Sequence, residues 1–430
     1  MQGDRLSHGL WEATAPPAPP APPLRGRVQV DVAVIGAGYT GLSAALHLAQ
    51  AGRSVAVLEA AEVGFGASGR NVGLVNAGMW VLPEVLPQRL GEVRGARLLR
   101  LLGDAPSLVF ELVARHGMAC EASRQGTLHC AVGASGLAGL RKRAAQWQQL
   151  EAPVELLSRD EAAARVGTGA YAGALLDRRA GTIQPLAYAR GLARAALAAG
   201  AALHGGSPVT GAEDRGGAWR LAIEGGGQVD ARWVVVATNT YTRPGGPWSA
   251  LAAELVRMPY FNLATRPLPA DLRRAILPGG EGAWDTRTVL SSLRLDAAGR
   301  LVFGSIGALR PPGHGIHLRW GRRALLRRFP ALEDVAFEHE WYGWIGMTSD
   351  ALPRFHALAR GVVSFSGYNG RGIGTGTVFG RELARLVLGE IGAADLALPQ
   401  RTIVPAPLRG ARERFYEAGA QVAHLVDARW

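Results

Sequence analysis

The chain has 430 residues, 48% of them hydrophobic, with a formal net charge of +12 at pH 7 and two cysteines. This length and composition allow two domains with large cores, and they exclude both a disordered chain and a small disulfide-stabilised one. The basic residues are nearly all arginines scattered along a chain rich in alanine and glycine, which indicates a solvated surface and predicts no nucleic-acid partner.

The N-terminal extension, residues 1–27, reads Ala-Pro-Pro three times in succession over residues 15–23. Proline favours an extended backbone, so this stretch predicts a spacer, preceded by a short apolar patch at Leu10 and Trp11. The first residues carry charges without an apolar core, and no apolar run reaches the length of a membrane span. We therefore expect a cytoplasmic protein with no signal peptide and no membrane span.

A glycine-rich turn follows the first predicted strand. The apolar residues 32–35 run into Gly36, Gly38 and Gly41, after which a helix is predicted. Gly36 allows the tight turn, Gly38 lets the backbone approach a pyrophosphate, and Gly41 lets the helix pack on the sheet. The free N–H groups at the start of this helix are suited to bind the phosphates.

A second apolar strand, residues 54–58, ends on Glu59, eighteen residues after the last glycine of the turn. Strand, glycines, helix, strand and acid thus occur in the order and spacing of a dinucleotide-binding unit. Glu59 can accept hydrogen bonds from both ribose hydroxyls, and its charge would repel a ribose phosphate, which disfavours NADP. The pattern predicts an enzyme that uses a nucleotide cofactor.

The middle of the chain alternates between helical and strand patterns. The strand at 230–238 has a buried Val-Val-Val core, and the helix at 185–199 begins at a proline, as helices often do. Helical patterns are predicted near 95–116, and helices at 135–150, 185–199 and 319–329. The predicted strands are 126–132, 219–224, 230–238 and several within 254–342.

A second strand–glycine–helix unit lies near the C-terminus. A strand at 361–366 leads into a glycine loop at 367–374 and then a helix to about residue 388. Two helix N-termini that converge on one ligand would suit a dinucleotide with a second polar head, such as a flavin whose reduced ring carries negative charge. This favours flavin over nicotinamide, although the loop by itself is equally compatible with an ordinary glycine-rich turn.

The order of these motifs resembles the FAD-dependent D-amino acid oxidase superfamily, in the branch of glycine oxidase and sarcosine oxidase. Within it, the chain is most similar to the γ-glutamylputrescine oxidoreductase-like proteins. The similarity covers nearly the whole chain, and the segments that carry it are 31–48, 66–71, 259–268, 284–287, 300–304, 348–353 and 367–372.

The resemblance implies an α/β fold: a Rossmann-like FAD-binding domain with an inserted α+β substrate domain that contains a large antiparallel or mixed sheet. We expect the split FAD-binding domain at 28–80, 180–245 and 343–400. The substrate domain is expected at 81–179 and 246–342, and a C-terminal helical tail at 401–430.

The same resemblance implies FAD as the cofactor and identifies the residues that would bind it. No histidine closely follows Arg70 and no cysteine lies between Glu340 and Gly374, so we expect noncovalent FAD, and no metal site is predicted. The expected FAD-binding residues are Gly36, Gly38, Tyr39, Thr40, Gly41, Glu59, Gly66, Ala67, Ser68, Gly69, Arg70, Asn71, Val209, Ala237, Thr238, Asn239, Gly370, Gly372, Ile373, Gly374 and Thr375.

The reaction implied by the family is oxidation of a C–N bond, in which hydride passes to flavin N5 and water hydrolyses the imine. Ile345, Gly370 and Gly374 stand where relatives keep carboxylate-binding arginine or lysine side chains. Losing these anchors argues against a simple α-amino acid and favours a primary or secondary amine, such as a polyamine derivative resembling γ-glutamylputrescine. Arg371 and Tyr260 are the candidate substrate-positioning residues, though a surface arginine and a core tyrosine are equally compatible.

Two alternatives stay open. One is a D-amino acid or N-methyl amino acid oxidase or dehydrogenase whose carboxylate anchor has moved to Arg371 or Arg294. The other is a non-catalytic basic flavoprotein. The sole lysine, Lys142, is expected far from the flavin motifs, so the oxygen-activating lysine of sarcosine oxidase has no counterpart, and either O2 or another acceptor could take the electrons. The oligomeric state is not predicted.

Further departures from the family pattern concern the flavin ring and the roof above it. Val72 replaces a second glycine, Arg266 replaces an expected glutamate, and Ser291-Ser292 replaces an aromatic pair. Val72 adds a side chain beside the ring and the serines open space in the roof, so both weaken the γ-glutamylputrescine assignment.

Overall fold

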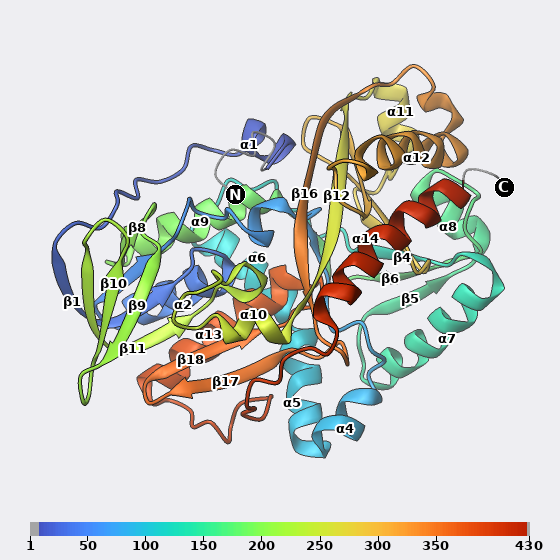
Figure 1. Cartoon of the computed structure of the whole chain (residues 1–430). Helices are drawn as coiled ribbons and strands as arrows, with labels where there is room; N and C mark the ends of the chain where they lie inside the picture. Colours follow the sequence, from blue (N-terminus) through green and yellow to red (C-terminus); the bar gives the residue numbers. More distant parts are fainter. Residues whose placement is uncertain (1–7, 428–430) are drawn as a thin grey trace.

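The computed structural model describes residues 8–427, so the first seven residues of the extension and the last three of the tail lie outside the described residues. The chain folds around two large mixed sheets, one in each half of the molecule, and β12 and β16 run where the halves meet (Figure 1). This confirms the predicted α/β fold class. No helix among residues 8–427 has the length and hydropathy required to cross a bilayer.

The first sheet has a parallel centre. β1 lies between β2 and β11 and pairs in parallel with both, and its last four residues are buried. The path through this sheet is β17 (Arg354–Ala359), β18 (Val362–Ser366), β11 (Gln228–Val236), β1 (Arg27–Ile35), β2 (Val55–Leu58) and β8 (Ala202–His204), with β10 (Trp219–Ile223) and then β9 (Val209–Asp214) branching from β11.

Three helices pack together against this sheet: α2 (Tyr39–Gln50), α9 (Pro185–Ala198) and α13 (Gly372–Leu388). Their buried faces join the strands in one large apolar core. Gly380 of α13 is required here, because a Cβ at that position would lie 2.5 Å from the Thr40 carbonyl oxygen of α2. The close contact holds the N-termini of α2 and α13 on the same side of the sheet.

The second sheet is antiparallel except where β13 pairs with β4. Helix α12 covers one face and shares an apolar core with it. The strand order is β16 (Phe337–Met347), β12 (Val256–Pro267), β15 (Arg300–Ile306), β14 (Ser291–Leu295), β13 (Gly282–Asp285), β4 (Thr127–Cys130), β6 (Ala174–Asp177) and β5 (Val154–Leu157). The helices of this half include α7 (Gly133–Gln149), α8 (Arg159–Val166), α11 (Ala270–Ala275), α12 (Gly313–Arg328) and α14 (Arg409–Val426).

The predicted elements are present with shifted bounds. The helical region expected near 95–116 forms two helices with Asp104 between them, and α12 begins six residues before the predicted 319. The remaining short elements are α1 (Leu10–Thr14), α3 (Ala67–Arg70), α4 (Val85–Leu90), α5 (Glu92–Gly103), α6 (Ala105–Arg115), α10 (Ala250–Glu254) and the paired strands β3 (Leu74–Val75) and β7 (Gly181–Thr182).

The proline-rich spacer is held against the first half of the molecule. The guanidinium of Arg190 donates to the carbonyl of Pro16, and Gly205 N–H donates to the carbonyl of Ala21. Before the spacer, the fully buried Trp11 donates its indole N–H to the Asn71 carbonyl at 2.8 Å. The predicted apolar patch therefore supports the loop that precedes β3.

The partition of strands supports the domain boundaries that we propose. Every strand of the first sheet lies within 27–58, 202–236 or 354–366, and every strand of the second lies within 127–177 or 256–347. β16 crosses the proposed boundary at residue 343, so this strand belongs to the substrate sheet up to Met347.

Candidate cofactor and substrate site

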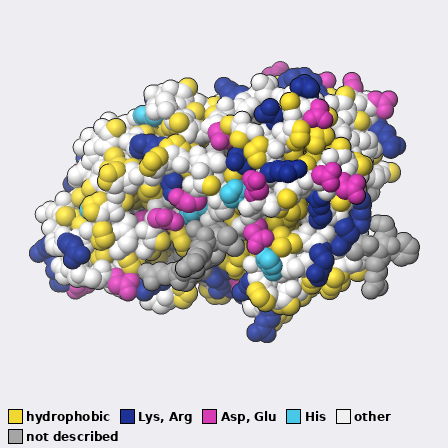
Figure 2. Space-filling model, turned by 90° about the horizontal axis from the view of Figure 1, so that it is seen from above, with side chains coloured by type: hydrophobic (Ala, Val, Ile, Leu, Met, Phe, Trp, Pro, Cys, Tyr) yellow, Lys and Arg dark blue, Asp and Glu magenta, His cyan; other side chains and the backbone are white. Residues whose placement is uncertain are grey.

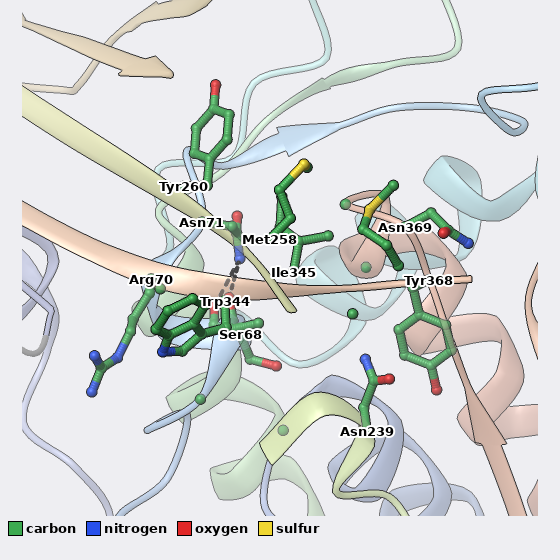
Figure 3. Close-up of a pocket in the computed structure, with 18 of the residues that line it drawn as sticks. Ser68, Arg70, Asn71, Asn239, Met258, Tyr260, Trp344, Ile345, Tyr368 and Asn369 are labelled. Atoms are coloured by element: carbon green, nitrogen blue, oxygen red, sulfur yellow. Dashed lines mark hydrogen bonds between the residues drawn. The ribbon is translucent and has the colours of Figure 1, made fainter. Parts of the chain in front are cut away.

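A cavity of about 1510 Å³ runs between the two sheets. Its lining begins at the glycine turn after β1 and extends to the roof formed by β12, β14 and β16. In Figure 3, Tyr260 of β12 lies above the cavity. Ser68 and Arg70 lie at the lower left, and Tyr368 lies at the right. This space is large enough for a dinucleotide and leaves room for a substrate under the roof.

The glycine turn has the conformation that its sequence predicts. Gly36 has a φ of +103°, which a side chain would strain. A Cβ at Gly41 would lie 2.0 Å from the Gly36 carbonyl oxygen, so only glycine allows this contact. Helix α2 begins after Gly38 with no side-chain cap, and Gly38, Tyr39 and Thr40 all line the cavity. The uncapped helix start can therefore bind an anion.

Glu59 lies at the end of β2 and lines the same cavity. Its carboxylate accepts hydrogen bonds from Ala37 N–H at 2.7 Å and Ala61 N–H at 2.9 Å. Burial raises the pKa of Glu59, and the backbone N–H groups partly counteract this rise. The acid is thus fixed beside the turn, with its position set by the backbone, where it can accept from ribose hydroxyls.

The loop around α3 closes the next part of the cavity. The Ser68 hydroxyl accepts from Tyr39 N–H at 3.1 Å, and Asn71 Nδ2 donates to the carbonyls of Ala67 and Ser68, each at 3.0 Å. The buried Arg70 guanidinium donates to the carbonyls of Phe65 and Tyr342, which joins this loop to β16. The loop is therefore fixed to both halves of the molecule.

The second glycine loop brings another helix N-terminus to the cavity. Helix α13 begins at Gly372, no side chain caps it, and Gly370, Gly372 and Ile373 line the cavity. The hydroxyls of Thr40 and Tyr368 hydrogen-bond each other at 2.8 Å, which links the start of α2 to the second glycine loop. The two helix N-termini predicted to converge do so in the structure.

Most predicted cofactor residues line this one cavity, and the others pack behind it. Gly69, for example, has no room for a side chain, because a Cβ would lie 2.4 Å from the Gly64 carbonyl oxygen. Lining residues are Gly36, Gly38, Tyr39, Thr40, Glu59, Gly66, Ala67, Ser68, Arg70, Asn71, Val209, Ala237, Thr238, Asn239, Gly370, Gly372 and Ile373. Those outside the lining are Gly41, Gly69, Gly374 and Thr375.

Aromatic side chains form the wall at the substrate-sheet end. Trp80 and Trp284 meet edge to face with ring centroids 5.0 Å apart, and His129 stacks on Trp284 at 3.4 Å. Burial lowers the pKa of His129 well below its usual range, so this ring is neutral. Above them, the Tyr260 hydroxyl hydrogen-bonds the Ser292 hydroxyl at 2.6 Å, and both residues line the cavity.

Arg371 lies behind this wall rather than in the lining. Its guanidinium carbon lies 4.9 Å from the Trp80 ring centroid and 5.0 Å from that of Trp284. Nη1 donates to the Ala77 carbonyl at 2.7 Å, whereas Nε has no partner among the described residues. Burial, with a smaller contribution from Arg143, lowers the pKa of Arg371 to about 9, so it remains cationic at neutral pH.

Arg143 of α7 holds the loop that carries Trp80. It donates to the carbonyls of Met79 and Val81, each at 3.2 Å, and also to that of Trp80. The Trp80 indole N–H in turn donates to the Asn369 carbonyl, next to the second glycine loop. The position of Trp80 is therefore determined from both sides of the cavity.

The positions where relatives keep carboxylate anchors are apolar or empty here. Ile345 lines the cavity on β16, and a Cβ at Gly370 would lie 3.4 Å from the Ile345 side chain. Figure 3 shows Ile345 close to Met258. Arg294, the other candidate anchor, lies outside this lining: it is 2% exposed, and it donates to the Ile183 carbonyl.

Lys142 borders the same cavity, so its expected separation from the site is wrong. It lies on α7, on the side of the substrate sheet, where its ammonium pairs with Glu84 at 2.7 Å and is 58% exposed. The sequence pattern correctly predicts α7 as a helix, but nothing in it indicates that this helix packs beside the cavity.

Sequence reasoning missed Trp80, His129, Arg143 and Trp344 as lining residues, and it assigned no role to Trp284. These five residues come from five separate segments, and each looks like an ordinary core or surface residue in its local sequence. The unbroken Met79-Trp80-Val81 stretch after a glycine was the one local signal available.

One group of possible metal ligands occurs among residues 8–427: His8, Glu12 and Glu62, whose ligand atoms lie within 4.8 Å of one another. Arg190 pairs with Glu12 at 2.7 Å, so one of the two carboxylates already has a cationic partner. It lies at the N-terminal segment, and none of the three residues lines the cavity.

Comparison with known proteins agrees with this geometry. Residues 31–386 match the family model described as FAD dependent oxidoreductase. The chain is 33% identical to γ-glutamylputrescine oxidoreductase of Escherichia coli K12 over 85% of each chain, and 32% identical to "Probable oxidoreductase OrdL" of Rhizobium meliloti over 94% and 93% of the two chains. The crystal structure of glycine oxidase from Geobacillus kaustophilus superposes with a TM-score of 0.70 at 21% identity, covering 87% of this chain and all of that one.

Proposed function

The chain belongs to the family of FAD-dependent oxidoreductases, and from this premise we propose that it oxidises the C–N bond of a primary or secondary amine. The amine loses a hydride and a proton to become an imine, and water hydrolyses the imine to a carbonyl compound and the released amine or ammonia. FAD supplies the hydride acceptor of this reaction. The protein binds the substrate, orients it and controls its protonation.

Bound noncovalently, FAD would extend along the cavity from Glu59 to the second glycine loop. The N-terminus of α2 would hold the pyrophosphate, Glu59 would accept from the ribose hydroxyls, and the start of α13 would face the flavin carbonyl edge. The turn fits such a ligand, because Gly36 and Gly38 line the cavity and the N-terminus of α2 carries no side-chain cap. Val209 and Asn239 line the space on either side of this path.

The observation that carries the substrate proposal is the apolar surface at Ile345. An α-amino acid needs a cation beside the reacting carbon, because a buried carboxylate without a partner is strongly unfavourable. Ile345 offers no such cation. Arg143 lines the cavity, but its guanidinium already donates to the carbonyls of Met79, Trp80 and Val81. Arg371 lies behind the tryptophans, and Arg294 lies outside the lining. An amine with no adjacent carboxylate therefore fits best.

Two buried cations, Arg143 in the lining and Arg371 behind the tryptophans, favour the reactive form of an amine. Only a neutral amine can release hydride readily, and a nearby positive charge lowers the pKa of a bound ammonium. Arg371 and Arg143 supply this charge in a region where burial reduces screening. Tyr260 and Ser292 are positioned to hydrogen-bond the polar end of the substrate from the roof.

The γ-glutamylputrescine oxidoreductase similarity supports a polyamine derivative as the substrate class. The glycine oxidase likeness keeps an amino acid oxidase as the second candidate, which would need an anchor that moves into the cavity on binding. A nucleic-acid-binding flavoprotein is less favoured, because the face in Figure 2 carries arginines interspersed with carboxylates.

Anaerobic mixing tests the proposal directly. We expect N-acylated putrescine to bleach the flavin absorbance, whereas glycine, sarcosine and D-alanine leave it unchanged. Subsequent exposure to air measures reoxidation, and a rate that supports turnover assigns O2 as the acceptor. Bleaching by the amino acids alone would contradict the amine proposal, and flavin that no amine or amino acid reduces would contradict the enzymatic assignment.

A further inference from the structure

The outer face of α14 carries a concentration of exposed apolar side chains. Among the described residues, eight large hydrophobic side chains are exposed, and six of them lie between residues 404 and 426. Phe415 is 71% exposed and Leu408 is 80% exposed. Scattered apolar residues on a surface are ordinary, but a contiguous group on one helix indicates an interaction surface. Figure 1 shows α14 on the outside of the molecule, across β12.

The spacing of this face is that of a helix–helix seam. Exposed residues recur at intervals of three and four, which is the a/d pattern of a heptad repeat. The seam, as we define it, consists of Leu408, which is the N-cap just before α14, and Ala411, Phe415, Ala418, Val422 and Leu425 on the helix, all of which are exposed. An 18-residue helix is about 27 Å long, so the seam runs its full length.

The opposite face of α14 is fixed to the substrate half of the protein. Glu413 accepts from Arg257 N–H at 3.0 Å, Glu417 pairs with Arg310 at 2.6 Å, and Asp427 accepts from the Trp320 indole at 2.8 Å. His424 is buried beneath the helix. The seam therefore cannot fold back onto its own chain, and it is presented on a rigid support.

We propose that the seam is the interface of a homodimer in which two α14 helices pack antiparallel across a two-fold axis. In this register, residue numbers of facing pairs add up to the same value. Leu408 faces Leu425 of the second copy, Ala411 faces Val422, and Phe415 faces Ala418. Each large side chain at the centre meets a small one, so the surface is complementary to itself, as a two-fold interface requires.

Charge also selects the antiparallel arrangement. Arg412 and Arg414 flank the seam near the N-terminus of α14. A parallel pair would place each arginine beside its twin and would stack Phe415 on Phe415. The antiparallel pair places the arginines level with Gln421 and Gly419 and directs them toward the half of the partner helix that ends in the negative pole of its dipole. Size and charge thus favour the same orientation.

Sedimentation of the FAD-loaded full chain tests the dimer. At about 50 µM, which is well above a micromolar dissociation constant, we expect a mass twice that of the 45.3 kDa chain. Phe415→Asp should raise the dissociation constant at least 100-fold and yield monomer with unchanged circular dichroism and flavin content. The matched control is Val93→Asp, which places the same charge at an exposed apolar residue outside the seam, and this variant should remain dimeric. A monomeric wild type, or a dimeric Phe415→Asp variant, would overturn the proposal.

Cysteine cross-linking tests the orientation. Because Cys120 and Cys130 are buried, new surface cysteines report alone. An equal mixture of Leu408→Cys and Leu425→Cys proteins should form a disulfide-linked dimer on mild oxidation, whereas neither variant should cross-link with itself. Cross-linking of each variant with itself would indicate parallel helices and would contradict our register. Monomeric protein that binds anionic phosphatidylglycerol vesicles, and loses this binding in Phe415→Asp, would instead assign the seam to a membrane surface.

Discussion

The part of the cavity around the first glycine turn comes from one stretch of chain, and Val209, residues 237–239 and the second glycine loop complete the cofactor end. The substrate end is assembled entirely from distant segments. The glycine turn, Glu59 and the Ser68–Asn71 loop all lie within residues 36–71. Trp80, His129 and Trp284 come from three separate segments and meet only in the folded protein. The cofactor end is therefore specified by local backbone geometry, and the substrate end by tertiary packing, so the two should respond differently to substitution.

The largest expected effect is at the cofactor end. In Gly41→Ala, the new Cβ would lie 2.0 Å from the Gly36 carbonyl oxygen, and the turn has to move to accommodate it. We expect FAD affinity to fall about 100-fold or more, which corresponds to a few kcal/mol of lost binding. Flavin content after purification and a binding titration measure this. Gly217→Ala is the control, because no atom lies within 4 Å of a Cβ there; equal flavin content in both variants would contradict the account.

The next effect separates the two ends. Arg371→Met removes the cation that lies against both Trp80 and Trp284, so we expect KM for the amine to rise about tenfold while FAD content stays unchanged. Loss of the positive charge should also raise the apparent pKa of the bound ammonium, so the pH profile of kcat should shift to higher pH. Arg371→Lys should restore the pH profile. A shift in neither KM nor the profile would show that Arg371 has only a packing role.

Ile345→Arg should shift the substrate preference from amines toward D-amino acids. An arginine on β16 would point into the apolar part of the cavity and could bind a carboxylate. We expect the ratio of kcat/KM for D-amino acids to that for amines to rise about tenfold, a change within the range of one charged hydrogen bond. Ile345→Met is the control and should retain the amine preference. An unchanged ratio in Ile345→Arg would indicate that the carboxylate binds elsewhere.

The smallest effect concerns acid stability in the substrate half. His317 and His424 lie with their Nδ1 atoms 2.8 Å apart, facing Glu417, Asp427, His314 and Arg323. Burial lowers the pKa of His317 to about 4 and that of His424 to about 3, from 6.5 in the unfolded chain.

This stabilisation by neutral histidines is complete above pH 6.5 and is lost as the pH falls toward the folded-state values. The loss is up to about 1.4 kcal/mol per pH unit for each histidine. We expect Tm to fall by roughly 2–4 °C per pH unit below pH 6. His317→Gln/His424→Gln should flatten this dependence, whereas His204→Gln should not; equal slopes in all three proteins would contradict the assignment to this pair.

The contrast between the two ends also explains what the sequence could predict. The turn at Gly36, Gly38 and Gly41 was predicted residue by residue, because its geometry depends on local backbone conformation and excluded Cβ atoms. The contact of Arg371 with both Trp80 and Trp284 was not predicted, because it depends on the packing of the loop at Trp80 against β13. Helix bounds shifted for a similar reason: α12 extends to Gly313 because it packs along the substrate sheet.

The central claim is that the substrate amine carries no carboxylate on the reacting carbon. A matched pair of compounds tests this: N-acetylputrescine and Nδ-acetylornithine, the latter as both enantiomers, share the same carbon chain and differ by that carboxylate. Rates of anaerobic flavin bleaching should be at least 100-fold higher for N-acetylputrescine, because the carboxylate would be buried against Ile345 without a partner. Faster bleaching by either ornithine derivative would contradict the account.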